Sequence, residues 1–226
     1  MEYFVDTADL EKVKKLAKWL PLEGITVNPS IVAKEGRELL PLVEEMLGYC
    51  SGIIHAQVLK SDPEGIKQEA KKLSEMNSER IFVKIPVTKT GLQAIKELDT
   101  DRINITATAV FGVSQALTAA KAGAKYIAPY VSRWDREIAQ SGVGLVKEIY
   151  NIINNYNSDA KVIAASVKNS KQIKELMELG IGAITMPPEI YIQAHNHNLT
   201  EKAVEIFEED WEKEFVNLSI TASKKS

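Results

Sequence analysis

The chain has 226 residues, of which 45% are apolar and 26% charged, as expected for a globular protein with a substantial core. Its formal net charge of -3 at pH 7 gives no general reason to expect binding to nucleic acid or to a membrane. A single cysteine, Cys50, excludes an internal disulfide. No apolar run reaches the roughly 18 residues that a membrane-spanning helix needs. The first residues predict a strand and a helix instead of a signal peptide, so we expect a cytoplasmic protein.

One pattern recurs along the chain: a short apolar strand, a polar residue near its end, and an amphipathic helix. The strands are predicted at residues 3–6, 24–28, 53–59, 80–87, 103–110, 126–131, 161–167 and 183–186. The helices are predicted to start after residues 7–9, to cover 29–48 with a possible interruption before Pro41, to open at 61–64, to cover 90–98 and 113–122, and to follow Pro187 and Pro188.

Eight strand–helix units with no hairpin signal between neighbouring strands indicate eight parallel strands. Right-handed crossovers close such strands most economically into a single α/β domain over residues 1–226, a (β/α)8 TIM barrel. A doubly wound open sheet is the alternative, but no Gly-rich dinucleotide turn follows the first strand.

An acidic helix is predicted after the barrel, at residues 200–215, with apolar residues at helical spacing. Its apolar face should be buried, either on an end of its own barrel or on a neighbouring molecule. The tail at residues 216–226 is expected to fray.

Lys84 stands in the middle of the fourth strand. The two-residue period puts Phe82 and Lys84 on one face, with Val83 and Ile85 on the other. No carboxylate lies within two residues of Lys84. Burying an unpaired charge costs on the order of several kcal/mol in lost hydration. Burial therefore favours the neutral amine, which can attack a ketone and form a Schiff base. Alternatively, Lys84 snorkels from a strand end or pairs with a distant acid.

Further polar residues lie near the carboxyl ends of the strands, where barrels of this kind place their reacting groups. Taken singly, Asp6 can be a helix cap, Asn28 a turn residue and Thr106 an ordinary strand residue. With Lys84 among them, their convergence on one mouth favours a catalytic site. The set comprises Asp6, Thr26, Asn28, Gln57, Thr106, Thr108, Tyr130 and Ser166.

A phosphate site is predicted beside them. Arg133 follows the sixth strand, and Ser166 and Lys168 come at the end of the seventh, where loops of these barrels often bind phosphate. Arginine supplies a bidentate fork and lysine a point charge, although Lys168 can equally be a solvated surface residue. His195 and His197 have a spacing found in metal sites but lack an obvious third ligand, so we expect no metal.

Five segments resemble the short-chain transaldolases and fructose-6-phosphate aldolases, and the resemblance extends over about residues 1–215. They are FVDTAD at 4–9, GITVNPSIVAKEG at 24–36, FVKIPVTKTGLQAIK at 82–96, AGAKYIAPYVSRWD at 122–135 and IAASVKN at 163–169. The resemblance implies a class I aldolase barrel that acts on a sugar phosphate through a Schiff base and needs no metal or other cofactor.

Residue by residue, the resemblance implies that Lys84 forms the Schiff base and Asp6 is the acid/base aspartate. It also implies that Asn28 and Ser166 hold the keto-sugar and that Arg133 binds the phosphate. Lys168 falls where transaldolases usually carry a second basic residue. Thr26, Thr106 and Ala128 are expected to contribute to substrate binding.

Gln57, Tyr130 and Ala128 resemble the aldolase branch, because transaldolases usually carry glutamate, phenylalanine and serine at these positions. Tyr130, with Gln57 and Thr108, could hold a water beside the imine. Thr106 and Trp134 depart from the usual pattern and leave the exact substrate open.

The expected reaction is reversible cleavage of fructose 6-phosphate to dihydroxyacetone and glyceraldehyde 3-phosphate. Transaldolase activity is the alternative, and a non-catalytic sugar-phosphate-binding barrel is a distant third. The resemblance also implies a homo-oligomer, a ring of five or two such rings, joined through the C-terminal helix.

Overall fold

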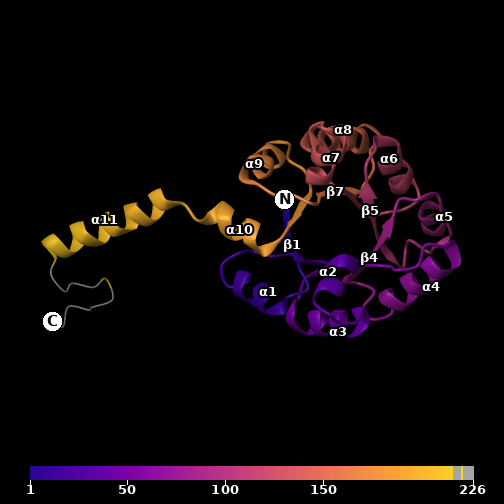
Figure 1. The fold of residues 1–226 in the computed structure, drawn as a ribbon, viewed down its shortest axis with the longest axis horizontal. Coiled ribbons are helices and arrows are strands. Elements are labelled where there is room, and N and C mark those ends of the chain that lie inside the picture. The colour runs from indigo at the N-terminus through magenta and orange to yellow at the C-terminus, as the bar shows by residue number, and fades with distance from the viewer. Residues whose placement is uncertain (216–219, 221–226) are drawn as a thin grey trace. The chain divides into compact units, whose positions relative to one another are not determined.

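The computed structural model describes residues 1–215 and residue 220. Eight parallel strands form a closed barrel in which β1 pairs with both β2 and β8, and helices surround the strands (Figure 1). The predicted (β/α)8 architecture is confirmed. The strands are β1 Glu2–Asp6, β2 Gly24–Thr26, β3 Ile53–Gln57, β4 Ile81–Pro86, β5 Asn104–Val110, β6 Tyr126–Pro129, β7 Lys161–Ala164 and β8 Ala183–Met186.

Most of the helices begin at a polar side chain that accepts a hydrogen bond from the first turn, as at Asp9, Asn28 and Asp62. The described helices are α1 Leu10–Leu16, α2 Pro29–Lys34, α3 Leu39–Tyr49, α4 Pro63–Ser74, α5 Lys89–Glu97, α6 Val113–Lys121, α7 Val131–Ile138, α8 Gly142–Asn155, α9 Ser170–Glu178, α10 Pro188–His195 and α11 Asn198–Glu214.

Several boundaries differ from the sequence prediction. The second, third and seventh strands were predicted to reach residues 28, 59 and 167, but β2, β3 and β7 end at Thr26, Gln57 and Ala164. The helical region at 29–48 is interrupted before Pro41, as predicted: the break lies at residues 35–38, where Gly36 adopts a φ of +63°. The sixth strand was predicted to reach residue 131, but it ends at Pro129. The amides of Val131 and Ser132 instead bond the carbonyls of Ala165 and Ser166 at the start of α7.

The strands separate two packed layers. Outward side chains such as Val5, Ile54 and Val83 pack against the helices. Inside the barrel, Phe4, Phe82 and Tyr126 meet edge to face, with the Phe82 and Tyr126 ring centroids 5.3 Å apart. Phe82 precedes Lys84 by two residues on the same face of β4, so this aromatic layer forms a floor beneath Lys84.

The floor is closed at the amino ends of the strands. The Tyr126 hydroxyl donates to one oxygen of Glu2 at 2.6 Å, and Lys161 Nζ donates to the other at 2.6 Å. Burial, and then the Glu2 carboxylate, raise the pKa of Tyr126 far above its ordinary value. Tyr126 therefore remains a neutral donor that fastens β6 to β1.

The chain divides into two compact units, residues 1–191 and residues 192–226. In the first unit the fully buried Tyr191 donates its hydroxyl to the carbonyl of Phe4 at 2.9 Å and so fastens the start of α10 to β1. The helix predicted at 200–215 is present as α11, in the second unit. The single-domain organisation stays a prediction, and the predicted fraying of residues 216–226 falls on residues that, apart from residue 220, lie outside the described part. No described helix is long and apolar enough to cross a membrane.

Candidate active site

Lys84 is held inside the barrel mouth by β4. Its side chain is buried, with the residue 5% exposed, and Nζ donates to the carbonyl of Val27 at 3.1 Å. Burial rules out a lysine that snorkels to solvent. Because the partner is a main-chain carbonyl, this bond orients the amine without neutralising a full positive charge.

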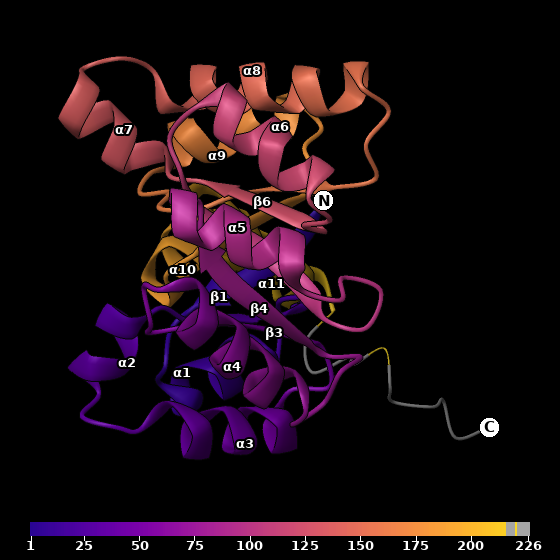
Figure 2. The same cartoon turned by 90° about the vertical axis from the view of Figure 1, so that its right-hand side faces the viewer.

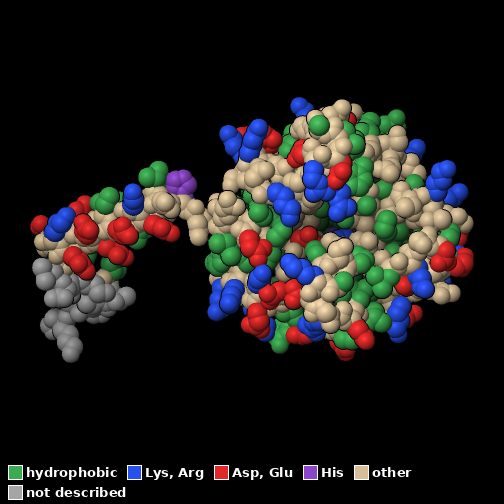
Figure 3. Space-filling view, in the orientation of Figure 1, with side chains coloured by type: hydrophobic (Ala, Val, Ile, Leu, Met, Phe, Trp, Pro, Cys, Tyr) green, Lys and Arg blue, Asp and Glu red, His purple; other side chains and the backbone are tan. Residues whose placement is uncertain are grey.

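A cavity of about 710 Å³ opens above Lys84. Lys and Arg side chains gather with Asp and Glu around the centre of the barrel face drawn in Figure 3. Loops and strand ends far apart in sequence contribute to the cavity. The predicted site residues that line it are Asp6, Asn28, Gln57, Lys84, Tyr130, Arg133, Ser166 and Lys168.

Two other predicted residues lie behind this lining and contact residues in it. The Thr26 hydroxyl donates to Asp6 Oδ1 at 2.7 Å and lies 2.7 Å from the hydroxyl of Thr185. The Thr108 hydroxyl lies 3.2 Å from that of Tyr130. Both threonines are buried, so each can orient a cavity residue.

Thr106 and Ala128 lie in the buried interior of the barrel, outside the cavity lining. Thr106 is buried and bonds His55, and Ala128 belongs to the apolar layer inside the barrel. Neither is among the described residues that line the cavity. Their direct contact with a substrate stays a prediction.

Tyr130 lines the cavity directly after the end of β6. Phe111 meets its ring edge to face at a centroid distance of 5.6 Å, and the Arg133 guanidinium lies 5.3 Å from the ring centre. Trp134 in turn stacks on Phe111, at 6.5 Å and 16°. Trp134, which departs from the usual family pattern, therefore packs on Phe111, the ring that supports Tyr130.

His55 is a site residue that sequence reasoning missed. It pairs in register with Phe82, one inward-facing layer below the Gln57–Lys84 pair, and its Nδ1 lies 2.8 Å from Thr106 Oγ1. Burial, and then the charge of Lys84, hold the pKa of His55 well below its ordinary range. A neutral imidazole thus lies in the floor of the site. The available signal was its position two residues before Gln57 on the same strand face.

Two buried polar atoms have no hydrogen-bond partner among the described residues: His55 Nε2 and Gln57 Oε1. Buried polar atoms are normally satisfied by protein or ordered water. Gln57 lines the cavity, but its Oε1 is itself buried, so rotation of the amide is needed for this oxygen to accept a hydrogen bond from a water or hydroxyl bound there.

Part of the cavity lining, called the cationic wall below, is formed by Arg133, Arg136 and Lys168. Arg133 and Arg136 come from α7, and Lys168 comes from the loop between β7 and α9. Ser166 precedes Lys168 with a φ of +61°, a left-handed conformation that costs a non-glycine residue about 1–3 kcal/mol. The turn directs the chain from β7 over the cavity.

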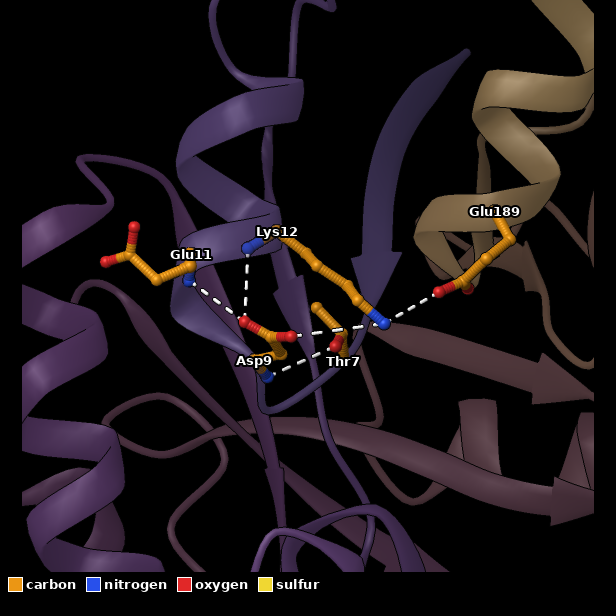
Figure 4. A network of polar contacts seen from close by, with 5 residues as sticks. All are labelled: Thr7, Asp9, Glu11, Lys12 and Glu189. Carbon is orange, nitrogen blue, oxygen red and sulfur yellow. Dashed lines mark hydrogen bonds and ion pairs between the residues drawn. The ribbon is translucent and has the colours of Figure 1, made fainter.

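Sequence reasoning also missed an ion pair at the cavity rim. Lys12 Nζ lies 2.8 Å from Glu189 Oε1 and 3.9 Å from Asp9 Oδ2, so that α1 and α10 are joined across the rim (Figure 4). The bond with Glu189 raises the pKa of Lys12, and Lys12 lowers the pKa of Glu189. Both side chains are exposed, so the pair adds little stability.

No group of three His, Cys, Asp or Glu residues in the described part of the chain could hold a metal ion. The site has instead one buried amine, one carboxylate bonded to a threonine, a phenol, an amide and a cationic wall. This set is suited to covalent and proton-transfer chemistry on an anionic carbonyl compound.

The family model described as Transaldolase/Fructose-6-phosphate aldolase matches residues 3–225. The chain belongs to this family. Members of the transaldolase/fructose-6-phosphate aldolase family work through a Schiff-base lysine without a metal cofactor.

Several relatives are similar over nearly their whole length, and each is named a probable transaldolase. The protein of Aquifex aeolicus is 39% identical over 94% of this chain and 97% of its own. That of Clostridium tetani is 37% identical over 93% and 98%, and that of Methanococcus vannielii 37% over 94% and 98%.

Among solved structures, the crystal structure of inosine 5' monophosphate dehydrogenase from Legionella pneumophila superposes with a TM-score of 0.58 at 14% identity. The match covers 84% of this chain and 58% of the other. At that identity the likeness concerns the barrel fold alone.

Proposed function

We propose that this member of the family is a class I aldolase that cleaves fructose 6-phosphate to dihydroxyacetone and glyceraldehyde 3-phosphate. The observation that carries the proposal is the surroundings of the buried amine. Lys84 shares its cavity with the phenol of Tyr130, and its register partner on β3 is the amide of Gln57 instead of a carboxylate.

In the proposed reaction the neutral Lys84 amine attacks the C2 ketone, and water leaves to give an imine. Asp6, or a water held by Tyr130, accepts the proton of the C4 hydroxyl as the C3–C4 bond breaks. The electron pair of that bond moves to the imine nitrogen and forms an enamine, while glyceraldehyde 3-phosphate departs. Protonation of C3 and hydrolysis of the imine then release dihydroxyacetone and restore Lys84.

Tyr130 supports this route because a phenol can donate a proton to the enamine or orient the hydrolytic water. The Thr108 hydroxyl at 3.2 Å would orient the phenol, and rotation of the Gln57 amide would bring its unpartnered oxygen to that water. Arg133 and Lys168 would bind the phosphate, and Asn28 and Ser166 the sugar hydroxyls.

Transaldolase activity is the second candidate, and the names of the relatives at 37–39% identity favour it. A transaldolase keeps its dihydroxyacetone enamine until an aldehyde acceptor arrives. The two activities share every step up to departure of the first aldehyde and differ in whether water or an acceptor resolves the enamine.

The deciding assay supplies fructose 6-phosphate without an acceptor and measures free dihydroxyacetone. We expect multiple turnovers for the natural chain, none for Lys84→Met, and unchanged turnover for Lys96→Met, which alters an exposed lysine on α5. Turnover that appears only after addition of erythrose 4-phosphate would favour the transaldolase. Borohydride with substrate should fix a three-carbon adduct on Lys84, and without one the covalent route is wrong.

A further inference from the structure

Gln172 is a buried amide in the first turn of α9, 8% exposed and outside the cavity lining described above. Its Oε1 accepts a hydrogen bond from the main-chain amide of Lys168 at 2.8 Å. Its Nε2 donates to Asp135 Oδ2 at 2.7 Å, and the Ser132 hydroxyl lies 3.0 Å from Nε2 and 3.1 Å from Oε1. Both ends of the amide therefore have partners, and together they join α7 to the loop between β7 and α9.

The bonds of Gln172 continue beyond Asp135. Asp135 Oδ1 accepts from the amide of Gly142 at 2.6 Å, so the same carboxylate joins α7 to the first turn of α8. A Cβ at Gly142 would lie 2.2 Å from the carbonyl oxygen of Val131, so α8 begins against the start of α7. In Figure 2, α7, α8 and α9 lie together on one side of the barrel.

The segments that Gln172 joins carry the cations of the cavity wall. Arg133 lies between Ser132 and Asp135 on α7, and Lys168 is the residue whose amide Gln172 accepts. Both cationic side chains are long and exposed. The region that each charged group can occupy therefore depends on where the backbone places its residue. The amides of Val131 and Ser132 already join these two segments through the carbonyls of Ala165 and Ser166. Gln172 adds a buried side-chain link between them, at the residues nearest to the two cations.

We propose that Gln172 is a positioning residue that sets the Arg133–Lys168 spacing and thereby the preference for phosphorylated over unphosphorylated aldehydes. The inference rests on the proposed function, in which these cations bind the substrate phosphate. Gln172 acts through the backbone of α7 and of the β7–α9 loop and does not touch the substrate itself.

The test compares two aldehydes that differ only in the phosphate, glyceraldehyde 3-phosphate and glyceraldehyde, each condensed with dihydroxyacetone. In Gln172→Met we expect the KM for glyceraldehyde 3-phosphate to rise roughly tenfold, because displaced binding groups lose much of their effect. The KM for glyceraldehyde and the kcat for both should stay within about twofold, since only phosphate binding is altered. Gln93→Met, on the exposed face of α5, is the matched control and should change neither.

An exchange of donor and acceptor separates positioning from simple destabilisation. Gln172→Glu alone removes the Nε2 donor and sets a second carboxylate against Asp135. Adding Asp135→Asn supplies the donor from the other side, and the amides of Gly142 and Lys168 keep their acceptors. The single variant should lose phosphate preference, and the double variant should regain most of it.

Three results would overturn the inference: unchanged KM for glyceraldehyde 3-phosphate in Gln172→Met, an equal loss with both aldehydes, or a double variant no better than Gln172→Glu. If Gln172→Met fails to fold, the exchange pair decides. Failure of the proposed function has a different signature: the natural chain releases no dihydroxyacetone from fructose 6-phosphate without an acceptor, or forms no borohydride adduct on Lys84. Even then, calorimetry with inorganic phosphate tests the inference, because Gln172→Met should weaken phosphate binding roughly tenfold.

Discussion

At the scale of single residues, the hydroxyl of Tyr130 is the atom that most directly separates water-resolved from acceptor-resolved chemistry. We expect Tyr130→Phe to lower fructose 6-phosphate cleavage without acceptor by about 100-fold, the lower end of the range for a lost proton donor. Transfer to added erythrose 4-phosphate should fall much less, because the acceptor carbonyl replaces the proton as the electrophile. Coupled assays of free dihydroxyacetone and of transfer product measure both rates.

The control for this prediction is Tyr156→Phe, which removes an exposed hydroxyl at the end of α8. It should leave both rates unchanged. Equal losses of cleavage and transfer in Tyr130→Phe would mean that the hydroxyl serves a step common to both activities, before the enamine is resolved.

His55 gives the barrel a predictable sensitivity to acid. Burial and the charge of Lys84 keep the pKa of His55 in the folded state well below the ordinary value. In the unfolded chain the pKa of this histidine is about 6.5. The unfolded state therefore binds more protons as the pH falls below about 6.5, and the free energy of unfolding decreases by up to about 1.4 kcal/mol per pH unit. Above that pH the contribution of the neutral His55 to the free energy of unfolding is fully present.

His55→Asn should flatten this dependence, since an amide can still bond the Thr106 hydroxyl but does not titrate. Urea unfolding between pH 7.5 and pH 5 measures the slope. His197→Asn, at the exposed cap of α11, is the control and should keep the natural slope. An unchanged slope in His55→Asn would show that another group carries the acid sensitivity.

The site residues that the sequence predicts best are those whose strand position fixes where they point. For Lys84, strand periodicity shows that it shares a face with Phe82, and the convergence of other polar residues on the same barrel mouth is what indicates a catalytic role. The His55–Thr106 bond joins residues 51 apart, and the contacts of Gln172 reach back 40 residues to Ser132. Such pairs depend on packing between elements, which one sequence does not reveal.

At the scale of elements, the repeat of strand and helix predicts the order and direction of all the strands, because parallel neighbours need crossovers. The boundary of the sixth strand was harder. Residues 130 and 131 continue an apolar run, but the amide of Val131 bonds Ala165 and begins α7. Competition between a strand ladder and a helix start is decided by the neighbouring strand, and local pattern cannot resolve it.

The region between β6 and β7 shows the same limit. The sequence analysis assigned no helix bounds there, yet α7 and α8 fill it. α7 is short and mostly polar, and its cohesion comes from Asp135, Gln172 and the close approach at Gly142. Both helices have apolar residues at helical spacing, such as Val131, Trp134 and Ile138 in α7, so the sequence carried a signal that sequence reasoning missed. Because α7 begins within two residues of the end of β6, no loop separates strand from helix there.

At the scale of the whole molecule, α11 presents a surface that the second unit does not bury by itself. None of its residues is buried, and its apolar residues Val204, Ile206, Phe207, Trp211 and Phe215 are 42–69% exposed. A cluster of exposed apolar side chains of this kind commonly marks an interaction surface. We propose that a second copy of the chain covers this surface in a homo-oligomer, as the ring of five or pair of rings expected from the sequence would require.

Removal of residues 197–226 should therefore convert the assembly to a species of monomer mass, detected by light scattering on a sizing column. Phe207→Glu in the full chain should weaken assembly in the same direction, because burying a carboxylate in an apolar contact is costly. Removal of residues 216–226 alone, which leaves α11 intact, is the control and should not alter the number of chains in the assembly. Borohydride trapping on Lys84 in each variant reports whether the barrel is still folded, so that loss of assembly is distinguished from loss of structure. If the chain without α11 keeps its full mass, assembly depends on the barrel surface, and the exposed face of α11 requires another partner.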